Sequence, residues 1–209
     1  MESQPVVCLV DDDPKILRLV SAILGECGLT VRTYDTAQGF LDDFRPGTRG
    51  CLLLDIQLPG LSGTELQGGL EARGIDVPVV FLTATADVPT TVTIMKRGAL
   101  DVLQKPFDAD ALVAAVTNAL ARDAADAGER ARRAEVLDRA ARLTPREREV
   151  MNLVVRGMAN KLIARELGLS DRTVEIHRGR VMEKMEADSV AELVRLSMLM
   201  SAQPPAPGQ

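Results

Sequence analysis

Five short apolar segments, separated by stretches with helical spacing, limit the possible folds of this chain more than any other feature. They lie at 6–10, 29–34, 51–54, 77–82 and 99–103. Strands that alternate with helices in this way are typical of a doubly wound parallel sheet. We therefore predict an α/β domain with five parallel strands in the order 2-1-3-4-5. Its switch point would lie between the first and third strands.

Polar side chains come at the ends of four of these segments. Asp11 and Asp12 follow the first segment, and Asp55 follows the third. Thr83 follows the fourth, and Lys105 comes shortly after the fifth. Parallel strands present their carboxyl ends at one edge of the sheet, and ligands bind there beside the switch point, so we expect these side chains to lie together. The acidic run alone could equally cap the helix that follows it, but the groups on the other strand ends favour a site.

This set of groups suits phosphoryl transfer to a carboxylate. The charge that develops on the phosphoryl oxygens during the attack must be neutralised. A Mg²⁺ ion held by carboxylates can neutralise it, and a lysine adds a point charge from the opposite side. A threonine hydroxyl can then hydrogen-bond the attached group, and its movement can report the event.

Residues 5–122 resemble the receiver domain of two-component response regulators, a (βα)5 domain of the flavodoxin-like fold. The resemblance implies that Asp55 is the phosphoacceptor and that a sensor histidine kinase supplies the phosphoryl group. It also implies a Mg²⁺ cofactor held by Asp12, with Asp11 nearby. The remaining ligands would be Asp55 and the backbone carbonyl of Gln57.

The same resemblance places Thr83 and Lys105 in contact with the phosphoryl group and implies a cis peptide bond before Pro106. The chain departs from the family at one position. Receivers often carry an aromatic switch residue three positions before the lysine, and Val102 stands there in this sequence. We therefore expect a smaller shift of the fourth helix and the fifth strand to carry the signal.

The composition changes after Leu120. Residues 123–142 are rich in Ala, Arg, Asp and Glu and predict a solvated helical connector, either separate from the fifth helix of the first domain or continuous with it. Its weakest point is Gly128, because glycine in a helix costs about 1 kcal/mol relative to alanine. The predicted divisions are a phosphoacceptor domain over 1–122, the connector over 123–142, a second domain over 143–202 and a disordered tail over 203–209.

The second domain is predicted to be wholly helical. Thr144, Pro145 and Glu147 make a strong helix start, with a threonine cap and proline at the first helical position. Four helices are expected near 145–156, 160–167, 171–184 and 189–200. A small residue, a glycine and an apolar residue at positions 164, 168 and 174 have the spacing of a helix-turn-helix.

The third of these helices follows Ser170, a good N-cap, and carries four cations. A solvated amphipathic helix is the alternative interpretation. Segments 143–150 and 173–185 resemble the LuxR-type DNA-binding domain, and the whole chain resembles response regulators of the FixJ/NarL type. This implies that the helix enters the major groove of promoter DNA, with Glu175, Ile176 and Arg178 toward the base edges. The groups expected at phosphates are Lys161, Arg172, Thr173, His177, Arg180 and Lys184.

Dimerisation is expected to contribute to DNA affinity. Many family members carry lysine at position 175, and the acid found here weakens non-specific attraction to DNA. We expect a homodimer when the protein is phosphorylated, with the last helix as the candidate dimer face. The residues of that face are Val190, Leu193, Val194, Leu196, Ser197 and Leu199.

The charge distribution and the bulk composition agree with two soluble units. Residues 1–122 carry 10 Lys and Arg against 16 Asp and Glu, a net charge of −6, and residues 143–209 carry 10 against 9, a net charge of +1. No apolar run approaches the roughly 20 residues that span a bilayer, and the N-terminus lacks the features of a signal peptide, so we expect a cytoplasmic protein. Cys8, Cys27 and Cys51 have no metal-ligand spacing and are expected to be unpaired.

The preferred hypothesis is a phosphorylation-activated transcription regulator that catalyses only its own phosphorylation and dephosphorylation. One rival is a hydrolase with an aspartyl-phosphate intermediate, as in haloacid-dehalogenase-like phosphatases. Those enzymes place a second acid two residues after the nucleophile, where Gln57 stands here. A third hypothesis keeps DNA binding but makes it independent of phosphate, because Val102 replaces the aromatic switch residue.

Overall fold

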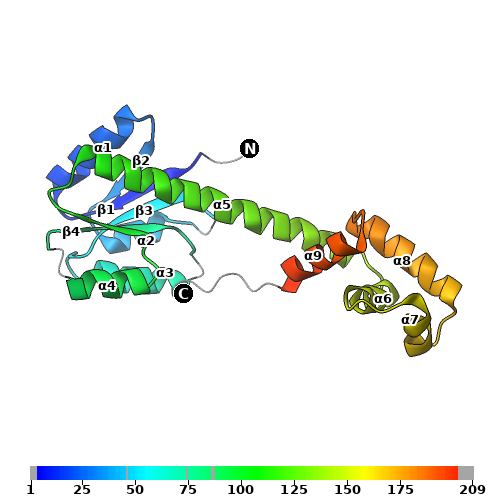
Figure 1. Ribbon diagram of the computed structural model, residues 1–209. Helices are drawn as coiled ribbons and strands as arrows, with labels where there is room; N and C mark the ends of the chain where they lie inside the picture. Colours follow the sequence, from blue (N-terminus) through cyan, green and yellow to red (C-terminus); the bar gives the residue numbers. More distant parts are fainter. Residues whose placement is uncertain (1–3, 46, 74, 86–87, 202–209) are drawn as a thin grey trace. The chain divides into compact units, whose positions relative to one another are not determined.

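The computed structural model describes residues 4–45, 47–73, 75–85 and 88–201 (Figure 1). The chain divides into two units, with the boundary between Asp126 and Ala127. Within the described ranges, no helix is both long enough and apolar enough to cross a membrane. The tail predicted over 203–209 lies outside the described residues.

The first unit is built on a five-stranded parallel sheet in the order β2-β1-β3-β4-β5, which confirms the predicted order. The strands are β1 (Val6–Val10), β2 (Thr30–Tyr34), β3 (Gly50–Asp55), β4 (Val79–Thr83) and β5 (Asp101–Gln104). The helices are α1 (Pro14–Glu26), α2 (Ala37–Asp43), α3 (Gly63–Ala72), α4 (Val88–Lys96) and the first part of α5 (Ala109–Ala141). The flavodoxin-like fold is therefore confirmed.

The central strands are buried on both faces because helices cover each side of the sheet. Alternate residues of β3 show this arrangement: Leu52 and Leu54 belong to one hydrophobic cluster and Leu53 to another. The cluster around Leu52 includes side chains of α2, α3 and α4, and the cluster around Leu53 includes side chains of α1 and α5. Figure 1 shows the same two layers of helices on the sheet.

The beginning of β3 is fixed by a close backbone contact and by a buried acid. Gly50 has a φ of +141°, and a Cβ at this position would lie 1.8 Å from the backbone oxygen of Val6. Asp123 of α5 is only 2% exposed. Its Oδ2 accepts hydrogen bonds from Nε of Arg49 at 2.6 Å and from the backbone N–H of Gly50 at 3.1 Å. Helix α5 is thus held at the amino ends of the strands, opposite the carboxyl ends where Asp55 lies.

The second unit contains the four predicted helices: α6 (Pro145–Val155), α7 (Asn160–Leu167), α8 (Asp171–Met185) and α9 (Val190–Ser201). Helix α5 also contributes to the core of this unit through Val136 and Ala140. The connector is helical as predicted, but it is not solvated throughout, because Asp123, Val136 and Ala140 are all buried. A Cβ at Gly128 would meet no other atom within 4 Å.

Side-chain caps define where α6 and α8 begin. Thr144 and Glu147 form a reciprocal capping box at the start of α6, as predicted. Ser170 accepts a hydrogen bond from the backbone N–H of Thr173 and caps α8. Between α7 and α8, Gly168 has a φ of +66°, a left-handed conformation that favours glycine and turns the chain between the two helices.

Candidate functional sites

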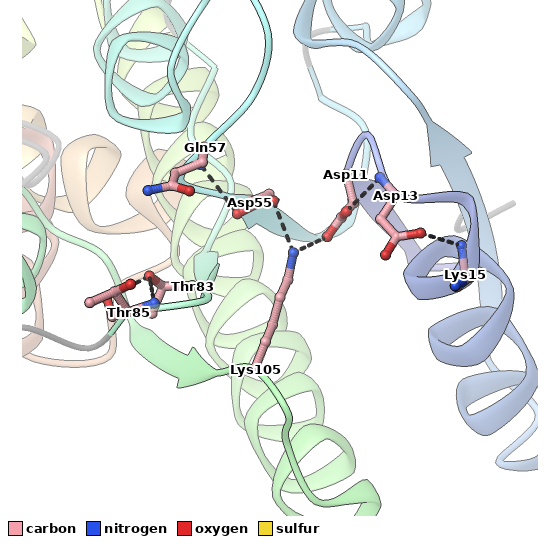
Figure 2. A network of polar contacts seen from close by, with 8 residues as sticks. All are labelled: Asp11, Asp13, Lys15, Asp55, Gln57, Thr83, Thr85 and Lys105. Carbon is pink, nitrogen blue, oxygen red and sulfur yellow. Dashed lines mark hydrogen bonds and ion pairs between the residues drawn. The ribbon is translucent and has the colours of Figure 1, made fainter.

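Three strand ends bring two carboxylates and a lysine together (Figure 2). Asp11 follows β1, Asp55 ends β3, and Lys105 follows β5. The Nζ atom of Lys105 lies 2.6 Å from Oδ2 of Asp11 and 2.9 Å from Oδ2 of Asp55. Asp11 is fully buried and Asp55 is 6% exposed. The groups that the sequence placed at one edge of the sheet therefore meet there.

The acidic residues that follow β1 have two roles, and different residues perform them. The side chain of Asp13 accepts a hydrogen bond from the backbone N–H of Lys15 at 2.8 Å and caps α1. Oδ1 of Asp11 accepts one from the backbone N–H of Asp13 at 3.0 Å, while its other oxygen faces Lys105. Asp12 between them is exposed. Helix capping and a carboxylate site are both present, so neither interpretation excludes the other.

The charges of this cluster favour binding of a cation. Burial raises the pKa of Asp11 despite the hydrogen bond from Lys105, and the charge of Asp55 raises it further. Burial lowers the pKa of Lys105, but the hydrogen bonds and the negative charges of Asp11 and Asp55 together outweigh burial and raise it. One carboxylate oxygen from each of Asp11, Asp12 and Asp55 lies within 4.8 Å of the other two. Three carboxylates beside one lysine form a donor set that suits a hard cation.

The loop after β3 packs directly against Asp55. Oδ1 of Asp55 accepts a hydrogen bond from the backbone N–H of Gln57 at 3.2 Å. At the end of this loop, Gly63 donates to the backbone oxygen of Ile56 at 3.0 Å. A Cβ at Gly63 would lie 2.3 Å from the backbone oxygen of Asp55. The missing side chain of Gly63 thus lets α3 begin against the acid, a role that no feature of the sequence indicated.

The hydroxyl of Thr83 is turned toward its own loop and away from the carboxylates in Figure 2. It donates to the backbone oxygen of Thr85 at 2.8 Å and accepts from the backbone N–H of Thr85 at 3.2 Å. Val102 is half-buried and lies beside Phe81 of β4. The peptide bond between Lys105 and Pro106 is cis, as predicted.

Helix α8 presents one exposed face. Arg172, Glu175, Ile176 and Arg180 are all exposed, with Ile176 at 49%. The opposite face, which includes Val174, is buried in the core of the second unit. Lys161 at the start of α7 is also exposed.

The other predicted DNA-contact residues of α8 are less exposed. The hydroxyl of Thr173 lies 2.7 Å from that of Ser170. His177 is half-buried, and its Nδ1 has no hydrogen-bond partner within the part of the chain that the structure describes. Nη1 of Arg178 donates to Oδ1 of Asn160, the first residue of α7, at 2.6 Å. Arg178 is half-buried, which differs from the expected place on the exposed face.

Lys184 is engaged within its own domain. Its Nζ lies 2.6 Å from Oε2 of Glu147, which is 2% exposed, and it also donates to the backbone oxygen of Arg142 at 3.2 Å. The resemblance to LuxR-type domains placed Lys184 among the phosphate contacts, as one of the cations on α8. The structure gives that cation a buried partner 37 positions earlier in the chain.

The predicted dimer face on α9 needs a correction. Leu193 and Leu196 are 1% and 6% exposed and belong to the core of the second unit. They pack inside the domain because α9 needs an apolar face of its own to attach to it. The large apolar residues of α9 that remain exposed are Val190 at 38% and Met198 at 65%.

Comparison with known proteins identifies both units. Residues 7–117 match the response regulator receiver domain, and residues 141–197 match the bacterial regulatory proteins of the luxR family. The transcriptional regulatory protein FixJ of Azorhizobium caulinodans is 44% identical over 203 residues, which cover 97% of this chain and 96% of that protein.

Two solved structures are similar over nearly the whole chain. The low-resolution structure of the response regulator StyR has a TM-score of 0.82 and 40% identity, and covers 94% of this chain and 99% of its own. Full-length FixJ from B. japonicum has a TM-score of 0.58 and 39% identity, with 95% and 98% covered. The chain therefore belongs to the response regulators that join a receiver to a LuxR-type DNA-binding domain, the transcription regulators of two-component systems.

Proposed function

We propose that a sensor histidine kinase activates this protein by transferring a phosphoryl group to Asp55. An oxygen of Asp55 forms a bond to phosphorus while the bond from phosphorus to the histidine nitrogen of the kinase breaks. The observation that carries the proposal is the position of Asp55 at the carboxyl edge of the sheet, 2.9 Å from Nζ of Lys105 and beside a second buried acid. Lys105 neutralises part of the negative charge that the arriving group brings.

Mg²⁺ is the proposed cofactor of this step. Asp11, Asp12 and Asp55 would hold it together with the backbone carbonyl of Gln57, because this set is made of oxygen donors of the kind Mg²⁺ prefers. When bound, the ion supplies positive charge next to the phosphoryl oxygens. Lys105 is then free to turn from Asp11 toward the new group.

Thr83 is the proposed reporter of phosphorylation. To donate to a phosphoryl oxygen on Asp55, its hydroxyl must give up the hydrogen bond to the backbone oxygen of Thr85. That exchange releases the backbone of Thr85, two residues after the end of β4. Since Val102 offers no ring to follow the movement, the shift is carried by α4 and by β5.

The proposed output is binding of promoter DNA through the exposed face of α8. Glu175 and Ile176 would lie toward the base edges, where glutamate can accept from cytosine and isoleucine can touch a thymine methyl. The residues proposed for phosphate contact are Lys161, Arg172, Thr173, His177 and Arg180. We propose that the phosphorylated protein binds as a homodimer in the cytoplasm, with half-sites roughly 34–36 Å apart.

The acceptor assignment is tested by incubating the full chain with acetyl phosphate and Mg²⁺ and measuring its intact mass. The wild type should gain one phosphoryl group, and Asp55→Asn should gain none. Asp42→Asn is the control, because Asp42 is an exposed acid on α2. Equal labelling of Asp55→Asn and the wild type would contradict the assignment. Sustained release of phosphate from esters would instead support the hydrolase hypothesis.

The link to DNA is tested by comparing promoter binding with and without acetyl phosphate. We expect tighter binding of the phosphorylated wild type and no change for Asp55→Asn. Val102 gives a specific reason to examine the alternative that DNA binding is independent of phosphate. Wild-type affinity that stays the same after complete phosphorylation would support that alternative.

A further inference from the structure

Arg178 is the cation of α8 whose place differs most from the sequence prediction. Nη1 of its guanidinium donates to Oδ1 of Asn160 at 2.6 Å, and Asn160 is the first residue of α7. This hydrogen bond joins the two helices of the helix-turn-helix at the start of the first. Both side chains are half-buried, so the pair sits at the border of the domain and is neither inside its core nor free in solvent.

Helix geometry places Arg178 on the flank of the base-reading face. Successive residues of an α-helix are rotated by about 100°, so Arg178 lies roughly 160° around α8 from Ile176 and roughly 60° from Glu175. Ile176 is 49% exposed, whereas Val174 and Val181, on the same side as Arg178, are buried. The long side chain of Arg178 leaves that side along the flank of α8 and ends at α7.

We propose that Asn160 is a positioning residue that holds the guanidinium of Arg178 for contact with a DNA phosphate. A helix that lies in the major groove has a sugar–phosphate strand along each flank, so a cation on its flank meets phosphates while the central face meets bases. The bond to Asn160 uses Nη1 and leaves Nε and Nη2 to donate to phosphate oxygens. Lys161, the exposed neighbour of Asn160, adds positive charge at the same end of α7.

The hydrogen bond from Arg178 to Asn160 makes the phosphate contact more favourable. A free arginine side chain loses much rotational freedom when it binds, and a guanidinium already held in place loses less. Asn160 is neutral, so it holds the guanidinium without cancelling its charge. The inference rests on the proposed entry of α8 into the major groove and replaces the expectation that Arg178 reads a base.

The test measures DNA binding by full-length, phosphorylated Arg178→Ala, Asn160→Ala and the double variant. The probe is a fluorescent duplex selected by the wild type from a random pool, followed over a series of salt concentrations. Arg178→Ala should weaken binding about tenfold and lower the salt slope by about one unit. Asn160→Ala should weaken it less, and the double variant should match Arg178→Ala. Arg165→Ala is the charge control, because Arg165 is an exposed cation of α7 outside the proposed DNA contacts.

Three results would overturn the inference. Additive losses in the double variant would show that Asn160 does not act through Arg178. A salt slope of Arg178→Ala equal to that of the wild type would show a purely structural role. A loss of affinity that depends on the identity of one base pair of the duplex would show base reading. Arg172→Ala separates these failures from failure of the proposed function, because it should weaken binding whenever α8 lies on DNA. If Arg172→Ala has no effect, the proposed DNA face itself is wrong.

Discussion

The buried carboxylate of Glu147 shows how much one residue contributes to the second unit. Its Oε2 accepts hydrogen bonds from the backbone N–H of Thr144 at 2.9 Å and from Nζ of Lys184 at 2.6 Å. Lys184 also donates to the backbone oxygen of Arg142. The end of α8 is thereby tied to the start of α6 and to the turn that follows α5. A buried charge with this many partners is costly to leave unpaired.

Substitution Glu147→Gln should destabilise the second unit by about 1–3 kcal/mol near neutral pH, because it weakens the bond to Lys184 and leaves that cation without its charged partner. The hydrogen bond from Lys184 lowers the pKa of Glu147 below its usual 4.5. A carboxyl whose pKa is lower in the folded state stabilises the fold above its unfolded pKa and loses that effect as pH falls through its folded value. The difference between wild type and variant should therefore shrink below pH 4.5.

Urea unfolding of both proteins between about pH 7 and about pH 3 measures this difference. Glu149→Gln is the matched control, since Glu149 lies two residues later with its side chain 51% exposed in a surface ion pair with Arg146. Such surface pairs contribute about 0–1 kcal/mol. A difference for Glu147→Gln that stays constant across this pH range would rule out the ionised pair as its cause.

For single residues, the sequence predicted which side chains belong to a site better than it predicted which residues they contact. Asp11, Asp55 and Lys105 could be placed together because each ends a strand, and strand ends share one edge of the sheet. Lys184 and Arg178 were predicted as DNA contacts from the resemblance to LuxR-type domains and from their charge on the third helix of that domain. Their bonds to Glu147 and Asn160 join segments 37 and 18 positions apart, and no periodicity in the sequence reports such pairs.

Among the elements, α5 has the most complex role, because it contributes to the cores of both units. Leu112 and Val116 pack against the sheet, and Val136 and Ala140 pack in the second unit. Asp123 is the last buried residue of α5 before the boundary between the units. Its bonds to Arg49 and Gly50 therefore fix where the helix leaves the first unit.

Substitution Asp123→Ala should destabilise the first unit by about 2–4 kcal/mol, because it leaves a buried N–H of Gly50 without this acceptor and Arg49 without this partner. Asp126→Ala is the control on the same helix. Asp126 pairs with Arg122, whose side chain is 58% exposed, so its loss should cost about 0.5 kcal/mol or less. Urea unfolding followed through the first unit compares the two. Equal losses would show that the buried pair contributes no more than a surface one.

The elements themselves were largely predictable, and their ends were not. Alternating apolar segments gave all five strands and their order, because the fold follows from the period of the pattern. The prediction placed a helical connector after the fifth helix and left open whether the two are continuous; in the structure α5 runs without a break from Ala109 to Ala141. The burial of Asp123 was missed because an acid in an Ala- and Arg-rich helix has the pattern of a solvated face. Its partners at the start of β3 lie 73 and 74 positions away.

The described part of the whole molecule contains a separate hydrophobic core in each of its two units. The sheet and its helices form the core of the first unit, and α6–α9 with the end of α5 form the core of the second. A ligand that binds only the folded form of one unit stabilises that unit and leaves the other unchanged. Metal binding and DNA binding can therefore be assigned to units by their effects on unfolding.

Mg²⁺ should raise the unfolding temperature of the first unit alone, because the three acids that can hold it lie there. At a concentration of about 100 times its dissociation constant, the ion should add about 2.7 kcal/mol of stability. Calorimetry of the full chain with Mg²⁺, and again after its removal with EDTA, should show one transition that moves and one that does not. Glu147→Gln should lower the transition that Mg²⁺ leaves in place.

Asp12→Asn is the sharpest variant for this experiment. Asp12 is exposed, whereas Asp11 and Asp55 both contact Lys105, so its loss should leave the metal-free protein as stable as the wild type. The variant should nevertheless lose most of the shift caused by Mg²⁺, because one of three carboxylate ligands is gone. If Mg²⁺ shifts the unfolding temperature of Asp12→Asn as much as that of the wild type, Asp12 is not a ligand of the ion. A shift of both transitions in the wild type would instead show that the two units are coupled in unfolding, since the ion could then act on the second unit only through the first.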